Sequence, residues 1–220
     1  MDSYFQTNQT FIDFFPTDGL GLRPPQLGAA SSLLALSTQR EMEPAIVVLP
    51  TGTGKTAVLQ LAPFLWRANR VLVITPSRLV REQIVDGFRE LALLKKLGVL
   101  GKEIPSPKVL SIDKRVGSKV SWQDCRDYDV VVATPNSISP SIEGIPVLPS
   151  DLFDVLLIDE AHHSPAKSYM AIINALPNAK KGFFTATPFR RDKRKIKGKL
   201  AYNYPLKSAI EDQTLSLIHI

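Results

Sequence analysis

Short apolar runs of valine, isoleucine and leucine recur along this chain, and helix-length segments separate them. Runs of this length that are apolar throughout are typical of strands in a parallel sheet with both faces covered. Alternation of such strands with helices predicts an α/β fold, with an open, mostly parallel sheet and helices on both faces. The predicted strands are residues 45–49, 71–75, 109–112, 130–134, 155–159 and 182–185, and the predicted helices are residues 25–40, 55–68, 78–96 and 166–176.

Composition indicates a globular chain without a membrane-spanning segment. The 220 residues are 44% hydrophobic and 22% charged, which is ordinary for a folded domain with a sizeable core. No apolar run approaches the roughly 18–20 residues that a bilayer span needs. The N-terminus lacks the basic start and apolar stretch of a secretory signal, and the single cysteine, Cys125, suits a reducing compartment. We therefore expect a cytoplasmic protein.

The formal charge of +6 comes from one short segment. Residues 190–199 hold seven basic residues and one acidic residue, and they include Arg190 and Arg191. A solvated linker and a contact with a phosphate backbone are both consistent with such a run.

A glycine-rich segment at residues 50–56 directly follows one predicted strand and opens a helix. In that position Gly52 and Gly54 allow the backbone to turn its N–H groups toward phosphates, and the helix N-terminus adds a positive dipole. Lys55 would reach the β- and γ-phosphates of a nucleotide, and the Thr56 hydroxyl would ligate Mg²⁺. The residues expected to bind the nucleotide here are Gly52, Thr53, Gly54, Lys55 and Thr56.

Two carboxylates, Asp159 and Glu160, end the predicted strand at 155–159. Ligands of open α/β sheets bind at the carboxyl ends of the strands, so these groups are expected beside the phosphate loop. Asp159 would hold Mg²⁺ through water, and Glu160 would position or deprotonate the attacking water. Together with Lys55 they form the predicted catalytic set.

These segments resemble the DEAD/DEAH-type superfamily-two helicases, most closely the branch that includes type III restriction subunits and related ATP-dependent DNA helicases. Leu49 stands where the general phosphate-loop pattern has its first glycine, a difference that helicase-type loops tolerate. The resemblance implies an N-terminal RecA-like P-loop NTPase domain that uses ATP. It also implies that Gln26, within residues 22–26, recognises the adenine base with its amide.

The same resemblance implies contacts with a single nucleic-acid strand at two further strand ends. Residues 75–83 match the first nucleic-acid motif of the family, and residues 133–137 match the second. Their hydroxyls, backbone N–H groups and basic side chains would hold phosphates without sequence preference. The residues concerned are Thr75, Pro76, Arg78, Thr134 and Pro135.

Residues 185–190 resemble the motif that couples the nucleotide state to the bound strand. In this interpretation the hydroxyls of Thr185 and Thr187 form hydrogen bonds with residues 159–162. Arg190 and Arg191 then leave the sheet beside the bound nucleic-acid strand.

The expected organisation is a lead-in at residues 1–20, an ATP-binding domain at 21–192 and a basic linker at 193–214 that starts a second RecA-like domain. That second domain, which would supply an arginine for the transition state, is expected to lie outside this chain. Residues 215–220 equal the translation of a common transposase adaptor, so an artificial tail is expected.

The sequence alone is consistent with three functions. The leading one is a helicase or translocase domain that hydrolyses ATP with Mg²⁺ on nucleic acid, with DNA favoured over RNA and with restriction or repair subunits as partners. A P-loop kinase or GTPase explains Lys55 and Asp159 but leaves the motifs at Thr75, Thr134 and Thr185 without a role. A module that binds ATP or DNA without turnover is the third. Stimulation of ATP turnover by nucleic acid separates these alternatives.

Overall fold

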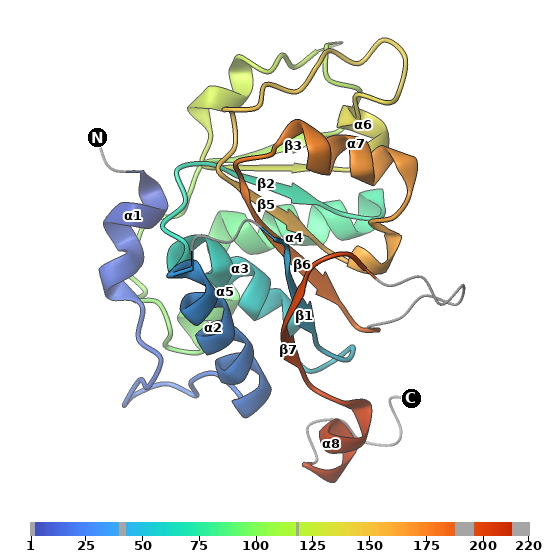
Figure 1. Cartoon of the computed structure of the whole chain (residues 1–220). Coiled ribbons are helices and arrows are strands. Elements are labelled where there is room, and N and C mark those ends of the chain that lie inside the picture. The colour runs from blue at the N-terminus through green and yellow to red at the C-terminus, as the bar shows by residue number, and fades with distance from the viewer. Residues whose placement is uncertain (1–2, 40–42, 118, 188–195, 213–220) are drawn as a thin grey trace.

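A single seven-stranded sheet forms the centre of the computed structural model, which describes residues 3–39, 43–117, 119–187 and 196–212 (Figure 1). The strand order is β3-β4-β2-β5-β6-β1-β7, and every pair in it is parallel. This confirms the predicted parallel α/β fold. The strands are β1 Ala45–Val48, β2 Val71–Ile74, β3 Val109–Ile112, β4 Val130–Ala133, β5 Val155–Ile158, β6 Lys180–Thr185 and β7 Lys199–Asn203.

Helices cover both faces of this sheet (Figure 1). One face packs against the first five α-helices of the chain, and the opposite face packs against α6 and α7. The α-helices are α1 Tyr4–Asn8, α2 Pro24–Ser37, α3 Lys55–Leu65, α4 Arg78–Glu90, α5 Ala92–Lys96, α6 Pro135–Ile138, α7 Lys167–Ala175 and α8 Leu206–Glu211, and the 3-10 helices are η1 Gln9–Phe11, η2 Asp124–Asp127 and η3 Ala161–His163.

The central strands are apolar throughout because they bury both of their faces. In β2, Val71 and Val73 point into the cluster under α2 and α3, whereas Leu72 and Ile74 point into the cluster under α7. All four side chains are fully buried. Burial of an aliphatic side chain contributes about 1.5–3 kcal/mol, so strands of this kind dominate the stability of the sheet.

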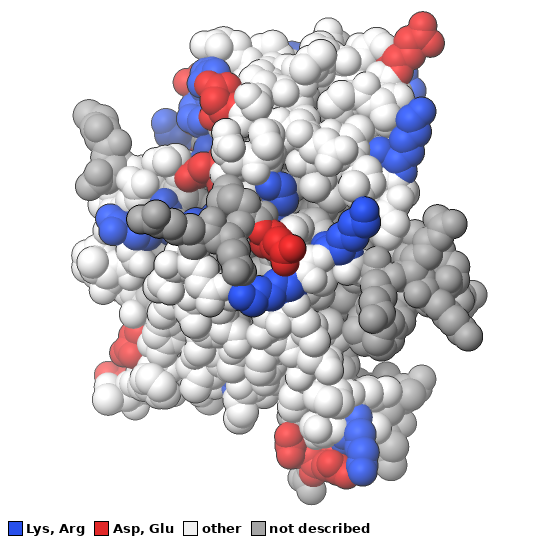
Figure 2. All heavy atoms as spheres, viewed as in Figure 1, with Lys and Arg blue, Asp and Glu red and all other residues white. Residues whose placement is uncertain are grey.

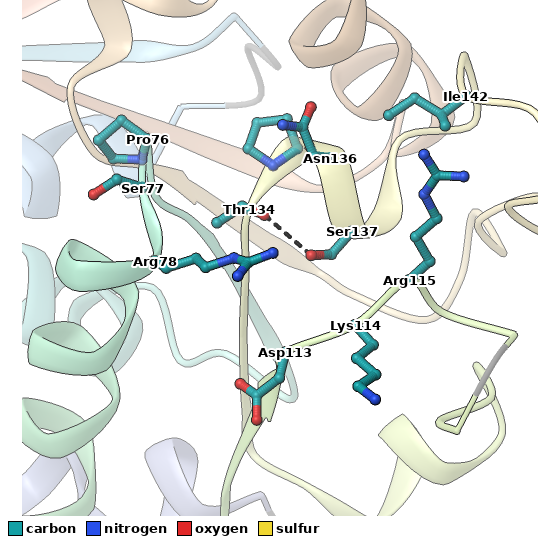
Figure 3. A pocket seen from close by; sticks show the side chains of 11 residues that line it. Pro76, Ser77, Arg78, Asp113, Lys114, Arg115, Thr134, Asn136, Ser137 and Ile142 are labelled. Atoms are coloured by element: carbon teal, nitrogen blue, oxygen red, sulfur yellow. Dashed lines mark hydrogen bonds between the residues drawn. The ribbon is translucent and has the colours of Figure 1, made fainter.

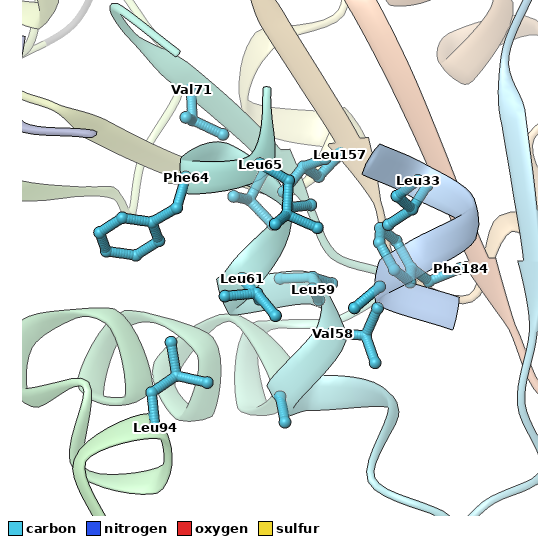
Figure 4. Packing of buried hydrophobic residues seen from close by; sticks show 14 of the residues in the cluster. Leu33, Val58, Leu59, Leu61, Phe64, Leu65, Val71, Leu94, Leu157 and Phe184 are labelled. Carbon is cyan, nitrogen blue, oxygen red and sulfur yellow. The ribbon is translucent and has the colours of Figure 1, made fainter. Parts of the chain in front are cut away.

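Helix α3 is the most deeply buried helix of the first cluster, since nine of its eleven residues are buried. Figure 4 shows its Leu59 and Leu65 packed among Leu33 of α2 and Phe184 of β6. The buried ring of Phe5 in α1 meets Phe64 of α3 edge to face at 4.9 Å. Residues of the expected lead-in therefore contribute to the core that holds α3.

Two elements differ from the sequence-based expectation. The predicted helix at 78–96 divides into α4 and α5 because Leu91 adopts a left-handed conformation, with φ at 49°, while its side chain stays fully buried. Strand β7 lies within the segment expected to be a linker, yet it pairs in parallel with β1 at the sheet edge. Its residues are half-buried or exposed, so it lacks the continuous apolar run that marked the other strands.

Charge is distributed without a dominant sign on the face drawn in Figure 2. Basic and acidic side chains are interspersed there, and neither covers a continuous area. Within the described part of the chain, no helix is both long and apolar enough to cross a membrane.

Candidate functional site

The phosphate loop lies at the carboxyl edge of the sheet, between the end of β1 and the start of α3. Gly52 and Gly54 adopt φ values of 87° and 91°, which non-glycine residues rarely adopt. A Cβ at Gly54 would in addition collide with the amide of Gln26. The loop therefore has the glycine-dependent curvature that the sequence predicts.

Lys55, the first residue of α3, meets both carboxylates at the end of β5. Its Nζ atom lies 3.0 Å from Oδ1 of Asp159, and it also forms an ion pair with Glu160. The side chains of Lys55 and Asp159 are only 14% and 10% exposed, so water screens this pair weakly. The structure thus brings together the three residues that the sequence assigns to catalysis.

The donor set around Asp159 fits a hard divalent cation. Within the described residues, its buried Oδ1 has no hydrogen bond of normal geometry, and its close neighbour is the Lys55 ammonium. The exposed Thr56 side chain lies on the first turn of α3, beside the same loop. A carboxylate and a hydroxyl next to a phosphate loop are ligands that Mg²⁺ takes in nucleotide sites.

A chain of polar contacts runs from Glu160 to the end of β6. His162 Nδ1 lies 3.2 Å from Oε2 of Glu160 and 3.3 Å from the Thr185 hydroxyl. That hydroxyl donates to the carbonyl of Thr187 at 3.0 Å and accepts from its N–H at 3.2 Å. Of the expected coupling residues, His162 therefore contacts both Glu160 and Thr185, whereas Thr187 contacts Thr185 through its backbone.

Tyr169 of α7 lies near these polar contacts, although no sequence motif identified it. Its ring stacks on His163, whose ring in turn contacts His162 at a centroid distance of 4.2 Å. Burial raises the pKa of Tyr169 to about 12, and the charges of Asp159 and Glu160 act in the same direction. Tyr169 therefore stays protonated at neutral pH.

Gln26 connects α2 to the phosphate loop. Its side chain is buried, its Oε1 accepts the Arg23 N–H at 2.8 Å, and its Nε2 donates to the Gly54 carbonyl at 3.2 Å. Arg23 also donates from Nη1 to the Gly52 carbonyl at 3.3 Å. The amide predicted to recognise adenine thus contacts the loop itself, and each end of the amide retains capacity for one further hydrogen bond. Sequence reasoning missed Arg23, because its partner lies in a distant loop.

The two nucleic-acid motifs meet at one pocket of about 580 Å³, formed where β2, β3 and β4 end (Figure 3). Four of the residues predicted to contact one nucleic-acid strand line this pocket: Pro76, Arg78, Thr134 and Pro135. Thr75 lies behind the pocket: it is fully buried, and its hydroxyl donates to the Ser77 carbonyl at 3.3 Å. Thr75 therefore shapes the loop and offers no exposed hydroxyl to a strand.

The loop after β3 also lines this pocket, and sequence reasoning did not identify it. Asp113, Lys114 and Arg115 follow a four-residue strand, and no motif distinguishes them from ordinary surface charges. Only the pairing of β3 with β4 brings them to the site. Arg190 and Arg191, the other predicted strand contacts, lie outside the described residues.

Comparison with known proteins agrees with this geometry. Residues 19–190 match the family described as "Type III restriction enzyme, res subunit". The chain is also 26% identical over 180 residues to the putative ATP-dependent helicase IRC3 of Saccharomyces cerevisiae. That match covers 77% of this chain and 24% of the yeast protein, so the chain spans about a quarter of the relative's length.

Solved structures share the fold. The UvsW helicase of bacteriophage T4 superposes with a TM-score of 0.57 at 18% identity, over 90% of this chain and 66% of that one. A nuclease-deletion mutant of the type ISP restriction-modification enzyme LlaGI, in complex with a DNA substrate mimic, gives 0.56 at 21% identity, over 89% of this chain and 21% of that one. With the family match over residues 19–190, the chain belongs to the family of type III restriction enzyme res subunits and has the α/β fold that these helicase structures share.

Proposed function

We propose that this domain binds and hydrolyses ATP and couples hydrolysis to movement along nucleic acid, as the ATPase domain of a helicase or translocase. The observation that carries the proposal is the continuous set of contacts from Lys55 through Glu160 and His162 to Thr185. It connects the phosphate loop to the end of β6, where the expected coupling motif begins. A nucleotide enzyme without a nucleic-acid role does not require this connection.

The nucleotide site works mainly by charge. Lys55 and the N-terminus of α3 neutralise the phosphates, and the glycine loop supplies backbone N–H donors. Asp159 and Thr56 would hold Mg²⁺, which would supply further neutralisation of the phosphate charge.

Glu160 is the group that activates the attacking water. Its carboxylate pairs with Lys55 and with His162. Phosphates that draw the Lys55 ammonium away leave this carboxylate free to accept a proton from water. His162 then transmits the change to Thr185, because its Nδ1 contacts both side chains. The coupling of nucleotide binding to Thr185 thus begins at Lys55, for which Glu160 and the phosphates compete.

The nucleic-acid strand occupies the pocket that Arg78, Thr134 and Pro135 line. Contacts of this kind hold phosphates and do not distinguish base sequences. DNA is favoured over RNA, because the family is that of restriction enzymes and the similar type ISP enzyme is described with a DNA substrate mimic. Subunits of a restriction or repair assembly are the corresponding partners.

A second RecA-like domain completes the enzyme by closing over the nucleotide and presenting an arginine to the transition state. The proposal is supported by the yeast relative, of which this chain matches only 24%. We expect the chain alone to bind ATP weakly and to hydrolyse it slowly. Fast turnover by these 220 residues would contradict the need for that domain.

ATP turnover of the complete parent protein tests the function directly. Phosphate release is measured with no nucleic acid, with single-stranded DNA and with single-stranded RNA, and Glu160→Gln serves as the inactive control. We expect stimulation at least about tenfold above the basal rate, with DNA the stronger activator. Turnover that neither polymer stimulates would assign the domain to a nucleotide enzyme of another class.

A further inference from the structure

We propose that Arg115, in the loop after β3, binds a backbone phosphate of the strand on the side of the pocket opposite Arg78. The inference rests on the proposed function and extends it to a residue outside the two recognised motifs. The chemistry that it addresses is the sugar-phosphate backbone of a single nucleic-acid strand.

Two guanidinium groups flank a pair of hydroxyls in this pocket. Thr134 Oγ1 and Ser137 Oγ lie 3.0 Å apart at the start of α6. In Figure 3 the Arg78 side chain extends toward Ser137 from the start of α4, and Arg115 extends toward Ile142 from the other side. Arg78 and Arg115 are both exposed, so both can reach a bound strand.

The backbone around Arg115 is fixed on both sides, so its position does not depend on a flexible loop. On the N-terminal side, Asp113 pairs at 2.9 Å with Nη2 of Arg81, whose side chain is only 5% exposed. Arg81 Nη1 also donates to the Ile112 carbonyl at 3.2 Å. On the C-terminal side, the N–H of the buried Val116 donates to the Ser137 carbonyl at 2.9 Å.

These two anchors tie the loop to α4 and α6, the helices that carry the recognised motifs. A backbone held in this way loses less conformational entropy when the loop binds a ligand. The ion pair with Arg81 also offsets the negative charge of the Asp113 carboxylate, which lies in the lining of the pocket. Basic side chains therefore outnumber acidic ones in the lining of the pocket, with Arg78, Lys114 and Arg115 against Asp113.

Arginine suits this position better than lysine does. Its planar guanidinium donates two parallel hydrogen bonds to one phosphate. Hydroxyls such as those of Thr134 and Ser137 donate single hydrogen bonds to phosphate oxygens, which is the common mode of sequence-independent contact. Two guanidinium groups on either side of them fit successive phosphates of one strand.

Lys119 offers a charge-matched control further along the same connection between β3 and η2. It is an exposed basic residue outside the pocket lining. The experiment measures binding of a fluorescein-labelled oligothymidylate by the full chain, by fluorescence anisotropy at several salt concentrations. Wild type is compared with Arg115→Ala, Arg115→Lys and Lys119→Ala, and circular dichroism verifies that each variant folds.

Arg115→Ala is expected to weaken binding about tenfold, equal to about 1.4 kcal/mol, and to reduce the salt slope by about 0.7. Arg115→Lys should restore the salt slope but only part of the affinity. Lys119→Ala should weaken binding less than about twofold. Equal losses for Arg115→Ala and Lys119→Ala would mean that only the general charge of the loop matters, and the inference would fail while the proposed function stands. Absence of binding by wild type would overturn both.

Discussion

The Lys55 ammonium lies 3.0 Å from Oδ1 of Asp159, which joins the loop after β1 to the end of β5 across the intervening strand β6. The same ammonium pairs with Glu160, 105 positions away in sequence. A nucleotide that binds the lysine must therefore compete with two carboxylates. In the proposed function, nucleotide binding therefore releases Glu160 from Lys55.

Substitutions of Lys55 and Glu160 in the complete protein should separate binding from hydrolysis. Lys55→Ala removes charge-assisted hydrogen bonds to phosphate, so ATP affinity should fall at least about tenfold. Glu160→Gln keeps Lys55 and should retain ATP binding while losing most hydrolysis. A fluorescent ATP analogue measures the first property and phosphate release measures the second. Equal loss of binding in both variants would mean that the two roles are assigned incorrectly.

Removal of Lys55 should also lower stability, since Asp159 would be left as a mostly buried carboxylate without its cation. We expect a decrease of about 1–3 kcal/mol in the free energy of unfolding. The double variant Lys55→Ala, Asp159→Asn should recover part of this loss, because the neutral amide no longer needs a counter-charge. Urea denaturation measures all three proteins. A double variant that is less stable than Lys55→Ala would contradict the ion-pair interpretation.

Gly54→Ala should disrupt the phosphate loop for two reasons, its positive φ and the collision of the new Cβ with Gln26. Gly144 provides a matched control, because its φ is 79° but a Cβ there meets nothing within 4 Å. Gly144→Ala should cost about 1–2 kcal/mol, the price of a left-handed alanine. Gly54→Ala should cost about 1–3 kcal/mol more and weaken ATP binding. Equal destabilisation of the two variants would argue against close packing of Gln26 on the loop.

Arg70 and Asp154 hold the opposite edge of the sheet, where β2 and β5 begin. Asp154 accepts backbone N–H groups of Asn69 and Arg70 at 2.8 and 2.7 Å. The Arg70 guanidinium donates to three backbone carbonyls, including that of Tyr128 at 3.1 Å. Arg70→Ala should therefore reduce the free energy of unfolding by about 2–4 kcal/mol without changing ATP affinity.

Arg126→Ala is the control for that prediction. Its side chain pairs with Asp151 at 3.4 Å, and the two side chains are 42% and 73% exposed. Exposed pairs contribute about 0–1 kcal/mol, so this variant should remain close to wild type in denaturant titrations. A comparable loss in both variants would show that the carbonyl contacts of Arg70 add nothing specific.

Alkaline pH should destabilise the fold between about pH 9 and 11. Burial, and then the charge of Asp124, raises the pKa of Cys125 from 9.0 to about 11. The unfolded chain therefore loses the thiol proton first, so the free energy of unfolding falls as pH rises through this range. Cys125→Ala should remove that part of the decline. The decline associated with Tyr169, whose pKa is raised from 10.0 to about 12, should persist.

The reactivity of the same thiol gives an independent measurement. Cys125 is fully buried, so the native protein at pH 8 should react slowly with a thiol reagent and the denatured protein quickly. Equal rates would mean that the helix η2 around Cys125 opens readily. They would also remove the reason for its raised pKa.

Local sequence determined much of this site. The apolar runs of β1, β2, β4 and β5 are buried on both faces, so the chain could place them only within a covered parallel sheet. Parallel strands end at a common edge, and the motifs that follow them therefore had to gather there. The glycines of the phosphate loop were predictable for the same reason, since strand, turn and helix are contiguous in sequence.

Contacts between distant segments were decided only by the tertiary structure. Gln26 and Arg23 contact the loop after β1, Arg81 holds the loop after β3, and Tyr169 lies near the catalytic carboxylates. Strand β7 could not be predicted from the sequence, because an edge strand buries little side-chain surface and needs no apolar run. A pattern in sequence records which residues are buried and how the backbone turns locally. Which polar group meets which depends on strand order and on the packing of helices, and these arise from the whole chain.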